Sequence, residues 1–568
     1  MNMSLIPKLH LGRVRQVTSA FYDLGFETWI KKIELHYLLP IRQRLLFWSK
    51  KNKTLPLLVE AEYESRKKEF PKRLRLALEK LGGTYIKLGQ MLSLRADLVG
   101  EEIADELSKL QDAVLPFPFS QAKQIIEKEL GKPLNKIFKK FDETPVGAAS
   151  LAQVHKATLP DGKTVAVKIL RPNIEAQVRE DIALLKWAAK TIEERISSLK
   201  PFHPVKFVNE FADWTLRELN LINEATNIEH FRELFKGEEH IYIPLVHWQY
   251  ATKKVLATDF SFGAKIDDFG AYPALNCSRE EVAAIGVKLA FKQFFEFGFF
   301  HGDPHPGNLF IKNNNTICLH DFGIVGRIDE NTRRELIGCY LDLFERDAEG
   351  ATRHLLHIAA LEENSDTDGF RRKVVEILET WLYTPGAGRR LSAAFYKMII
   401  SGASRKISFP QNVALLAKAV VTMESVALKI DPKFNLIESL RPYLNQLLTM
   451  ELKPEAILKR GRETLLDSAR LAVDLPEAAR KFVKLLEQEA VGVRLDTREF
   501  IDIKREIDRQ SDIRILSMIL VADLLATSVL LHLEGVQKIA GIPLGAFGVT
   551  LAAFLTVAVL FKIRKGYK

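Results

Sequence analysis

One polar loop and the hairpin that follows it constrain the fold more than any other feature of the sequence. Residues 301–308 read HGDPHPGN, and a helical run, EEVAAIGVKLAFKQFFEFG, leads into them. The stretch from 308 to 323, NLFIKNNNTICLHDFG, alternates like a β-hairpin that turns at its three asparagines. The glycines and prolines therefore predict a tight polar loop between a helix and a hairpin.

The spacing of polar residues in this region is typical of phosphoryl transfer from ATP. Asp303, Asn308 and Asp321 follow the pattern Asp-x-x-x-x-Asn and then Asp-Phe-Gly. In that chemistry one carboxylate lies near the accepting hydroxyl or water, while the asparagine and the second carboxylate hold Mg²⁺. The segment TVAVKIL, after a PDG turn, predicts a strand that carries Lys168 to the α- and β-phosphates. Glu224, in NEATN, is expected to pair with Lys168.

A hydrolytic metal centre is the alternative interpretation of the polar loop. It leaves both Lys168 and Asn308 unexplained, so phosphoryl transfer is favoured. Two of the histidines are then expected to hold the loop through hydrogen bonds to backbone, and His305 to shape the acceptor side. The candidate ligands of the alternative centre are His301, Asp303, His305, His320 and Asp321.

Two features of protein kinases are missing from the sequence. The segment before the lysine strand reads PVGAASLAQVHKA, with one glycine where a G-x-G-x-x-G loop would cover the phosphates. The nucleotide is therefore expected to contact Ala148, Ala149 and Ser150. No APE motif follows Asp321 at the usual distance, so the apparatus for a peptide substrate is not evident.

Composition and charge narrow the class of protein. Hydrophobic residues make up 47% of the chain and charged residues 27%, which is typical of a folded protein. The net charge of +10 fits a membrane surface or a phosphorylated ligand, and no nucleic-acid recognition motif accompanies it. The three cysteines form no CxxC pair, as expected in a reducing compartment.

Two apolar segments close the chain. Residues 515–533 contain one acid, Asp523, residues 543–561 contain no charge, and each segment is 19 residues long, enough to span a bilayer. Asp523 costs about 3 kcal/mol on insertion, and the Leu, Ile and Val residues around it return about 3 to 6 kcal/mol. Basic residues flank the pair on both sides and predict a membrane hairpin with both ends in the cytoplasm. A buried helical hairpin is the alternative.

Taken together, these motifs resemble the UbiB/ADCK family of atypical kinases, over residues 70 to 440. The loop GAASLAQVH is similar to the family's alanine-rich loop, and KLGQ, residues 87–90, to its lysine–glycine–glutamine motif. The resemblance implies that Lys87 and Gln90 lie over the site where a protein substrate would otherwise dock. Lys87 is expected to meet an acidic Glu-x-Asp pair, in which Glu218 is present and Asn220 replaces the aspartate.

The expected fold class is α+β: a two-lobed, protein-kinase-like fold with an N-terminal helical extension and a C-terminal transmembrane helical hairpin. An amphipathic helix near the N-terminus is expected either to lie on a membrane or to pack on its own domain. The expected parts are an N-terminal segment (1–70), the helical extension with KLGQ (71–144), the N-lobe (145–262), the helical C-lobe (263–510) and two membrane helices (511–568).

The family is associated with ubiquinone and related prenyl-quinone biosynthesis. The resemblance therefore implies an ATP- and Mg²⁺-dependent enzyme, an ATPase more than a kinase of other proteins. Its expected location is the bacterial inner membrane, with the kinase-like domain on the cytoplasmic side. The expected partners are ATP, membrane lipids, prenyl-quinone precursors and enzymes of quinone biosynthesis. Two alternatives remain open: a true kinase acting on a small molecule, lipid or protein, and a nucleotide-gated scaffold.

Overall fold

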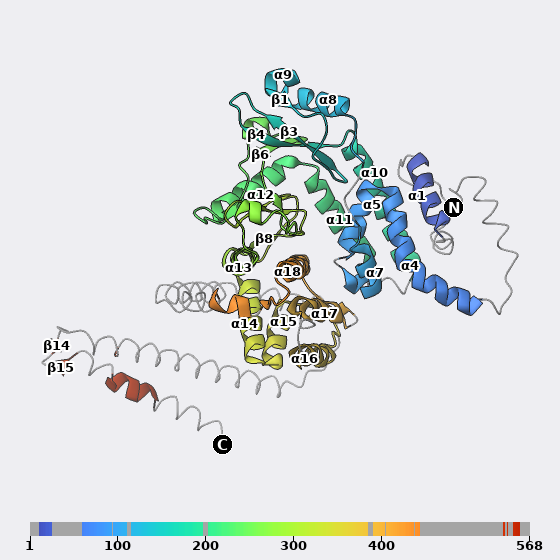
Figure 1. Ribbon diagram of the computed structural model, residues 1–568. Coiled ribbons are helices and arrows are strands. Elements are labelled where there is room, and N and C mark those ends of the chain that lie inside the picture. The colour runs from blue at the N-terminus through green and yellow to red at the C-terminus, as the bar shows by residue number, and fades with distance from the viewer. Residues whose placement is uncertain are drawn as a thin grey trace. The chain divides into compact units, whose positions relative to one another are not determined.

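The computed structural model (Figure 1) describes most of the chain up to residue 443. The chain divides into two compact units, Met1–Lys453 and Pro454–Lys568. The described residues are 11–24, 59–93, 95–110, 115–196, 203–383, 390–403, 405–436, 438–443, 527, 538–539, 542–543 and 549–556.

The second unit contains few described residues. They include a short antiparallel pair, β14 (Lys538–Ile539) with β15 (Ile542–Pro543), and helical residues 549–556. The apolar segments 515–533 and 543–561 lie largely outside the described residues, so the membrane hairpin stays a prediction. Within the described part of the chain, no helix combines the length and the apolar character needed to cross a membrane.

The N-lobe is built on a five-stranded antiparallel sheet in the order β1-β3-β4-β6, with β2 paired to β3. The PDG turn joins β3 to β4, which confirms the predicted hairpin. Because side chains alternate along a strand, Val165, Val167 and Ile169 are buried on one face and Lys168 projects from the other. The strands are β1 (Lys140–Phe141), β2 (Gly147–Ala148), β3 (Ala152–Thr158), β4 (Thr164–Leu170) and β6 (Val255–Asp259).

Two helices cover the apolar face of this sheet. Ala122 and Ile126 of α8 (Phe119–Leu130) and Ile137 of α9 (Leu134–Ile137) are buried in one cluster with the valines of β4. Strand β1 also joins the sheet. Residues 119–141 therefore belong with the N-lobe, although their sequence pattern groups them with the helical extension.

Three helices lie between β4 and β6 in the chain and support the lysine side of the sheet. They are α10 (Ile174–Arg195), α11 (Pro204–Glu218) and α12 (Leu221–Leu234). The N-terminal helices pack against α10 and α11, and an ion pair between Arg13 and buried Asp181 joins α1 to α10 at 2.7 Å. These helices are α1 (Leu11–Asp23), α4 (Val59–Leu81), α5 (Gly83–Ser93), α6 (Ala96–Val99) and α7 (Glu101–Leu107).

The glycine of KLGQ has a packing role in this helical extension. A Cβ on Gly89 would lie 2.2 Å from a side-chain carbon of Leu110 and 2.8 Å from one of Leu78. A larger residue at this position would require these leucine side chains to shift. Gly89 therefore favours the close packing of the helix that carries Lys87 within the extension.

The C-lobe combines a small sheet with helices. Its four strands run in the order β5-β10-β9-β7, and a separate pair joins β8 to β11. The predicted hairpin at NNN is confirmed, because β9 and β10 pair antiparallel and Asn314 and Asn315 take positive φ at the turn. These strands are β5 (Ile241–Tyr242), β7 (Ala264–Lys265), β8 (Phe299–His301), β9 (Leu309–Lys312), β10 (Thr316–Leu319) and β11 (Val325–Arg327).

Beyond residue 330 the described part of the first unit is mainly helical, as expected, and one short antiparallel strand pair joins β12 (Ala360–Leu361) to β13 (Ile407–Ser408). The run predicted before the polar loop is α13 (Arg279–Phe291), continued by one π-helical segment, Lys292–Phe297. The remaining helices are α14 (Glu330–Glu345), α15 (Ala348–Ile358), α16 (Thr367–Tyr383), α17 (Leu391–Ala403) and α18 (Gln411–Ile430). Short 3₁₀ turns span Trp248–Tyr250 and Pro273–Leu275.

Candidate active site

A cavity of about 480 Å³ lies where the N-lobe sheet, α5, α12 and the polar loops of the C-lobe meet. Its lining contains every residue predicted to bind the nucleotide, hold Mg²⁺, orient the nucleophile or form the Lys87 contact, except Ala148. Ala148 lies at the end of β2, where it pairs with Gln153 of β3. Residues that lie far apart in the sequence, from Lys87 to Asp321, are therefore brought to one cleft.

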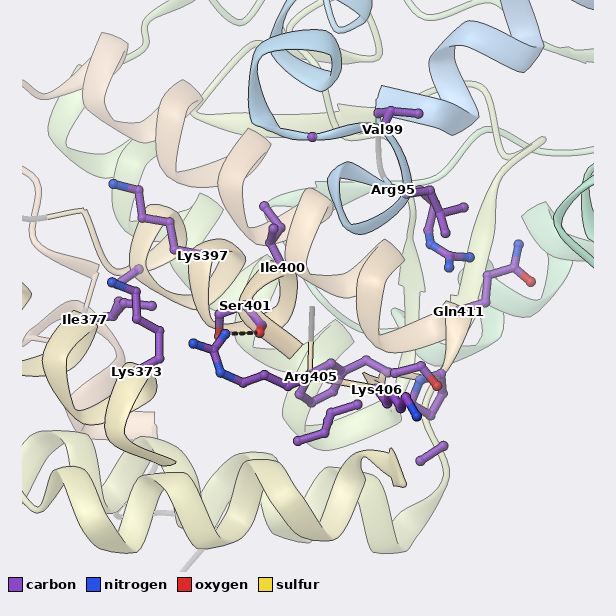
Figure 2. Close-up of a pocket in the computed structure, with 18 of the residues that line it drawn as sticks. Arg95, Val99, Lys373, Ile377, Lys397, Ile400, Ser401, Arg405, Lys406 and Gln411 are labelled. Carbon is purple, nitrogen blue, oxygen red and sulfur yellow. Dashed lines mark hydrogen bonds between the residues drawn. The ribbon is translucent and has the colours of Figure 1, made fainter. Parts of the chain in front are cut away.

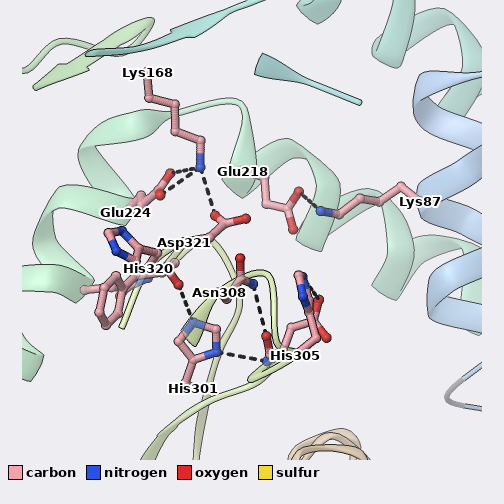
Figure 3. A network of polar contacts seen from close by, with 12 residues as sticks. Lys87, Lys168, Glu218, Glu224, His301, His305, Asn308, His320 and Asp321 are labelled. Atoms are coloured by element: carbon pink, nitrogen blue, oxygen red, sulfur yellow. Dashed lines mark hydrogen bonds and ion pairs between the residues drawn. The ribbon is translucent and has the colours of Figure 1, made fainter. Parts of the chain in front are cut away.

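Lys168 is the centre of the charged cluster in this cleft (Figure 3). Its Nζ lies 2.8 Å from both carboxylate oxygens of Glu224 and 2.9 Å from Oδ1 of Asp321. The three residues come from β4, from the first turn of α12 and from the segment after β10. One lysine thus bridges the N-lobe sheet to the loop after the C-lobe hairpin.

The charges of this cluster shift one another's pKa values. Lys168 holds the pKa of Asp321 well below its usual range, against the effect of burial. Burial alone would lower the pKa of Lys168, but the charges of Asp321 and Glu224 outweigh it and raise that pKa. Burial raises the pKa of Glu224 to about 6, although Lys168 opposes the rise. Asp321 is therefore ionised at neutral pH. Of the three residues, Glu224 has the pKa that lies nearest to neutral pH.

The backbone at Asp321 is held in a rare conformation. Its φ is 56°, in the left-handed region that few non-glycine residues adopt. The side chain of Asn227, on α12, donates a hydrogen bond of 2.9 Å to the carbonyl of the next residue, Phe322. Phe322 is itself buried against Phe231 of α12, with 5.0 Å between ring centroids. Helix α12 thus positions both Glu224 and the segment that carries Asp321.

His301 holds the polar loop by its two ring nitrogens, as expected. Its Nε2 lies 2.9 Å from the carbonyl of His320, and its Nδ1 accepts a 3.1 Å hydrogen bond from the backbone of Asp303. Burial lowers the pKa of His301, so the neutral ring fits this pair of bonds. Both nitrogens are engaged with backbone, so His301 is not available as a metal ligand.

His320 differs from the expectation that it also bonds backbone. Its Nε2 lies 3.4 Å from Sγ of Cys318, and its ring packs edge-on against Phe310. Burial lowers the pKa of His320 to about 4. Among the described residues, the three-residue group whose ligand atoms converge is Glu335, His354 and His357, on α14 and α15. The alternative metal centre at the polar loop therefore has no support in the geometry.

Asp303 and Asn308 are joined within the loop. The side-chain amide of Asn308 donates a 3.1 Å hydrogen bond to the carbonyl of Asp303, and its backbone amide donates to the carbonyl of His305 at 2.9 Å. Asn308 is almost fully buried. The carboxylates of Asp303 and Asp321 and the amide oxygen of Asn308 are the hard oxygen donors that Mg²⁺ prefers, so the residues present fit this ion.

Lys418, on α18, is a site residue that the sequence motifs did not indicate. Its Nζ lies 3.1 Å from Oδ1 of Asp303, and His305 Nε2 lies 3.9 Å from the other carboxylate oxygen. Burial would raise the pKa of Asp303, but Lys418 and His305 outweigh it and lower that pKa. Helix α18 carries no motif that would mark Lys418, and only the tertiary fold brings it to the loop.

The KLGQ helix meets the cleft through Lys87. Its Nζ lies 2.5 Å from Oε2 of Glu218, the last residue of α11, and both side chains are largely buried. Gln90, one turn on, also lines the cavity. Asn220, which replaces the family aspartate, caps α12 instead: its Oδ1 accepts a 3.2 Å hydrogen bond from the backbone of Ile222.

The site defines a kinase-like domain of mixed helices and sheets, because a strand lysine and a helix glutamate of one lobe meet two polar loops of the other. Residues 109–355 match the ABC1 atypical kinase-like domain. The chain belongs to the ABC1, or UbiB, family of atypical kinases, because relatives more than 30% identical to it, over two thirds or more of their length, accompany this domain match.

Relatives that are 31–32% identical to the chain match it over more residues than this domain contains. The chain is 32% identical to "Protein ACTIVITY OF BC1 COMPLEX KINASE 7, chloroplastic" of Arabidopsis thaliana, over 81% of this chain and 67% of that protein. It is 31% identical to "Probable protein kinase UbiB" of Xanthomonas campestris, over 76% of this chain and 79% of that protein. The protein of the same name in Marinobacter nauticus is 32% identical, over 71% and 75% of the two chains. These similarities confirm the resemblance inferred from the motifs.

Proposed function

We propose that the protein is a membrane-anchored ATPase of the atypical kinase class that binds Mg-ATP and supports ubiquinone, or a related prenyl-quinone, biosynthesis. The observation that carries the nucleotide site is the cluster of Lys168, Glu224 and Asp321, with contacts of 2.8 to 2.9 Å. A buried lysine between two carboxylates is an arrangement suited to a phosphate group and a metal ion. The quinone role rests on the family and on relatives named UbiB.

In this proposal each residue has a separate task. Lys168, positioned by Glu224, binds the α- and β-phosphates, and the backbone at Ala149 and Ser150 lies along the nucleotide. Asn308 and Asp321 would hold Mg²⁺, which neutralises phosphate charge when bound. Asp303 orients the attacking water and accepts its proton. Lys418 keeps Asp303 ionised for that role.

Water is favoured over a protein substrate because of the KLGQ helix. Lys87 and Gln90 line the same cavity as Asp303, and the ion pair of Lys87 with Glu218 fastens α5 to α11. A peptide would have to displace this helix to bring a hydroxyl to Asp303. Hydrolysis of ATP requires no such movement.

A true kinase is the second candidate, favoured by the likeness of HGDPHPGN to the loops of small-molecule kinases. The two candidates differ in where the γ-phosphate goes. With labelled ATP and membrane extract, the ATPase predicts label in inorganic phosphate alone. Label on a lipid or protein that is lost in Asp303→Asn would favour the kinase.

The physiological role can be tested by lipid profiling. A strain lacking the protein is complemented with the wild type or with Lys168→Ala, and its quinones and their precursors are measured. Wild type should restore the quinone level, and Lys168→Ala should leave precursors in place because the phosphates lose their main cation. Full restoration by Lys168→Ala would refute a role for nucleotide chemistry and leave the scaffold alternative.

A further inference from the structure

A second and larger cavity lies outside the nucleotide cleft (Figure 2). Its volume is about 1370 Å³, and it shares no lining residue with the nucleotide cavity. The segment after α5, the N-terminal half of α11, and helices α16 and α17 form its walls. Ligand sites usually have volumes of about 300 to 1,000 Å³, so this cavity can hold a large ligand.

Positive charge dominates the polar lining of this cavity. Seven Lys or Arg side chains face three glutamates, Glu210, Glu362 and Glu376. Lys373 pairs with Glu376 at 2.7 Å, and Arg95 lies 3.7 Å from Glu210. Of the other five, Arg405 donates a 2.7 Å hydrogen bond to the carbonyl of Ser401. Within the part of the chain that the structure describes, Lys206, Arg390, Lys397 and Lys406 make no ion pair. An excess of cations in a recess attracts an anion, and a multiply charged one most strongly.

The rest of the lining is apolar. Phe207 of α11, Ile377 and Trp381 of α16 and Ile400 of α17 face the cavity between the cations. Lysine and arginine stems add further apolar surface around the same space. Inorganic phosphate would leave these walls in contact with water, whereas an amphiphile would cover them.

We propose that this cavity binds an amphiphile with a phosphate head group: lysine and arginine side chains of the lining hold the phosphate, and the aromatic and aliphatic walls hold the apolar part. The head group can belong to a membrane lipid or to a freely diffusing phosphate ester. Both have the same chemistry, and the experiment below separates them.

The cavity is connected to the nucleotide cleft by two segments of the chain. Helix α11 places Lys206, Phe207 and Glu210 in the cavity and ends at Glu218, the partner of Lys87. The opposing segment carries Lys87 in α5 and Arg95 just after it. Two ion pairs, Lys87–Glu218 at 2.5 Å and Arg95–Glu210 at 3.7 Å, therefore join the same two segments.

Further contacts lie along this connection. A pocket of about 220 Å³ lined by Met91, Arg95, Glu210 and Trp214 shares residues with both larger cavities. The hydroxyl of Tyr396, on α17, donates a 3.2 Å hydrogen bond to the carbonyl of Ser93 at the end of α5. A phosphate that draws Arg95 away from Glu210 would thus loosen α5 from α11 next to the nucleotide. By thermodynamic linkage, nucleotide and amphiphile must then alter each other's affinity by the same factor.

The binding test uses the full-length chain in phosphatidylcholine nanodiscs and isothermal titration calorimetry. The probes are dihexanoyl phosphatidic acid, dihexanoyl phosphatidylcholine with the same chains, and inorganic phosphate. Saturable binding is expected for the phosphatidic acid alone. Lys397→Glu with Lys406→Glu should weaken it at least about tenfold, because two attractive charges become repulsive. The control, Lys123→Glu with Lys128→Glu on exposed positions of α8, should bind as the wild type does.

Three results would overturn the proposal: equal binding of the zwitterionic probe, equal binding of inorganic phosphate, or equal loss in the control variant. Nanodiscs that contain long-chain phosphatidic acid identify the source. If they abolish binding of the soluble probe, the site takes a membrane lipid. If they leave it unchanged, the site takes a free phosphate ester. Either result supports a phosphate-amphiphile site.

The coupling rests on the proposed nucleotide site, and a separate titration tests it. The Kd of Mg-ATP is measured with and without saturating dihexanoyl phosphatidic acid, and the reverse titration is done with ATP present. Each ligand should change the Kd of the other by the same factor, and this factor should lie closer to one in Arg95→Gln. Unchanged affinities would refute the coupling. Absence of ATP binding with normal phosphatidic acid binding would refute the proposed function and leave the second site standing.

Discussion

Lys168 has one positive charge between two carboxylates, so the cluster carries net negative charge before a ligand arrives. Phosphate groups cannot join it without a change in these pairings. A divalent cation on Asp321 would free Lys168 for phosphate while Glu224 keeps the lysine in place. The proposed nucleotide site is therefore expected to bind ATP together with Mg²⁺ and to bind neither well alone.

The titration of Glu224 gives a prediction with a defined sign. Because its pKa is raised to about 6, the wild-type carboxylate becomes neutral as the pH falls through that value and then resembles glutamine. The ratio of the Mg-ATP Kd of Glu224→Gln to that of the wild type should exceed one at about pH 8 and approach one at about pH 5. Protonation of ATP affects both Kd values equally and therefore cancels in this ratio. A ratio that does not change with pH would contradict this assignment.

Lys418 gives a second residue-scale prediction. It helps to keep the pKa of Asp303 low, so Lys418→Met should raise that pKa and move the acid limb of the pH–rate profile to higher pH. Asp303→Asn should reduce turnover by about 10² or more while the Kd of Mg-ATP changes little, as for loss of a general base. If Lys418→Met lowers the rate equally at every pH, Lys418 supports the fold or substrate binding and does not tune Asp303.

At the scale of single residues, the sequence predicted those site residues that belong to recognisable motifs. Lys168, Glu224, Asp303, Asn308 and Asp321 follow spacings that chemistry requires, and the fold brings them to one cleft. Lys418 could not be predicted, because a lone lysine on an amphipathic helix carries no signal of its partner. The same holds for the cavity beside α17, whose cations look like ordinary solvated charges in the sequence.

At the scale of elements, α12 is the piece on which the site depends most. It carries Glu224 in its first turn and, through Asn227, holds the backbone that follows Asp321. Its N-terminus is capped by Asn220, so the departure from the family pattern at this position keeps the hydrogen bond that starts the helix. An aspartate would make the same cap and add a charge.

Substitution at Asn220 tests this role. Asn220→Ala should lower the free energy of unfolding by about 1 kcal/mol, and Asn220→Asp should leave it nearly unchanged, since both Asn and Asp cap helices well. Chemical denaturation of the two variants measures the difference. Equal stability of the alanine variant and the wild type would show that the cap contributes nothing.

Turn signals made the hairpins predictable, whereas other connections depend on packing. The PDG and NNN turns fall where the sequence placed them. The pairing of β8 with β11, which sets His301 beside the segment after Asp321, joins strands too short to carry a periodic pattern. The π-helical segment after α13 likewise follows from the tertiary fit of its phenylalanines, such as Phe294 against Phe300.

At the scale of the whole molecule, the nucleotide cavity and the second cavity are both lined by residues of the first unit, Met1–Lys453. Membrane attachment is expected from the apolar segments of the second unit. Removal of residues 511–568 should therefore move the protein from the membrane to the soluble fraction and leave the Mg-ATP Kd within about twofold, by the independence of distant sites. Retention of the truncated chain in the membrane would assign attachment to another segment, such as the N-terminal helix.

The most direct test of the account is the release of inorganic phosphate from Mg-ATP by the purified full-length chain in lipid nanodiscs. The wild type is compared with Asp321→Asn and with the matched control Asp161→Asn, in the exposed turn between β3 and β4. We expect Mg²⁺-dependent turnover in the wild type and the control, and a loss of about 10² or more in Asp321→Asn, because a metal-holding carboxylate is gone. Absence of turnover in the wild type, or equal turnover in Asp321→Asn, would contradict the account.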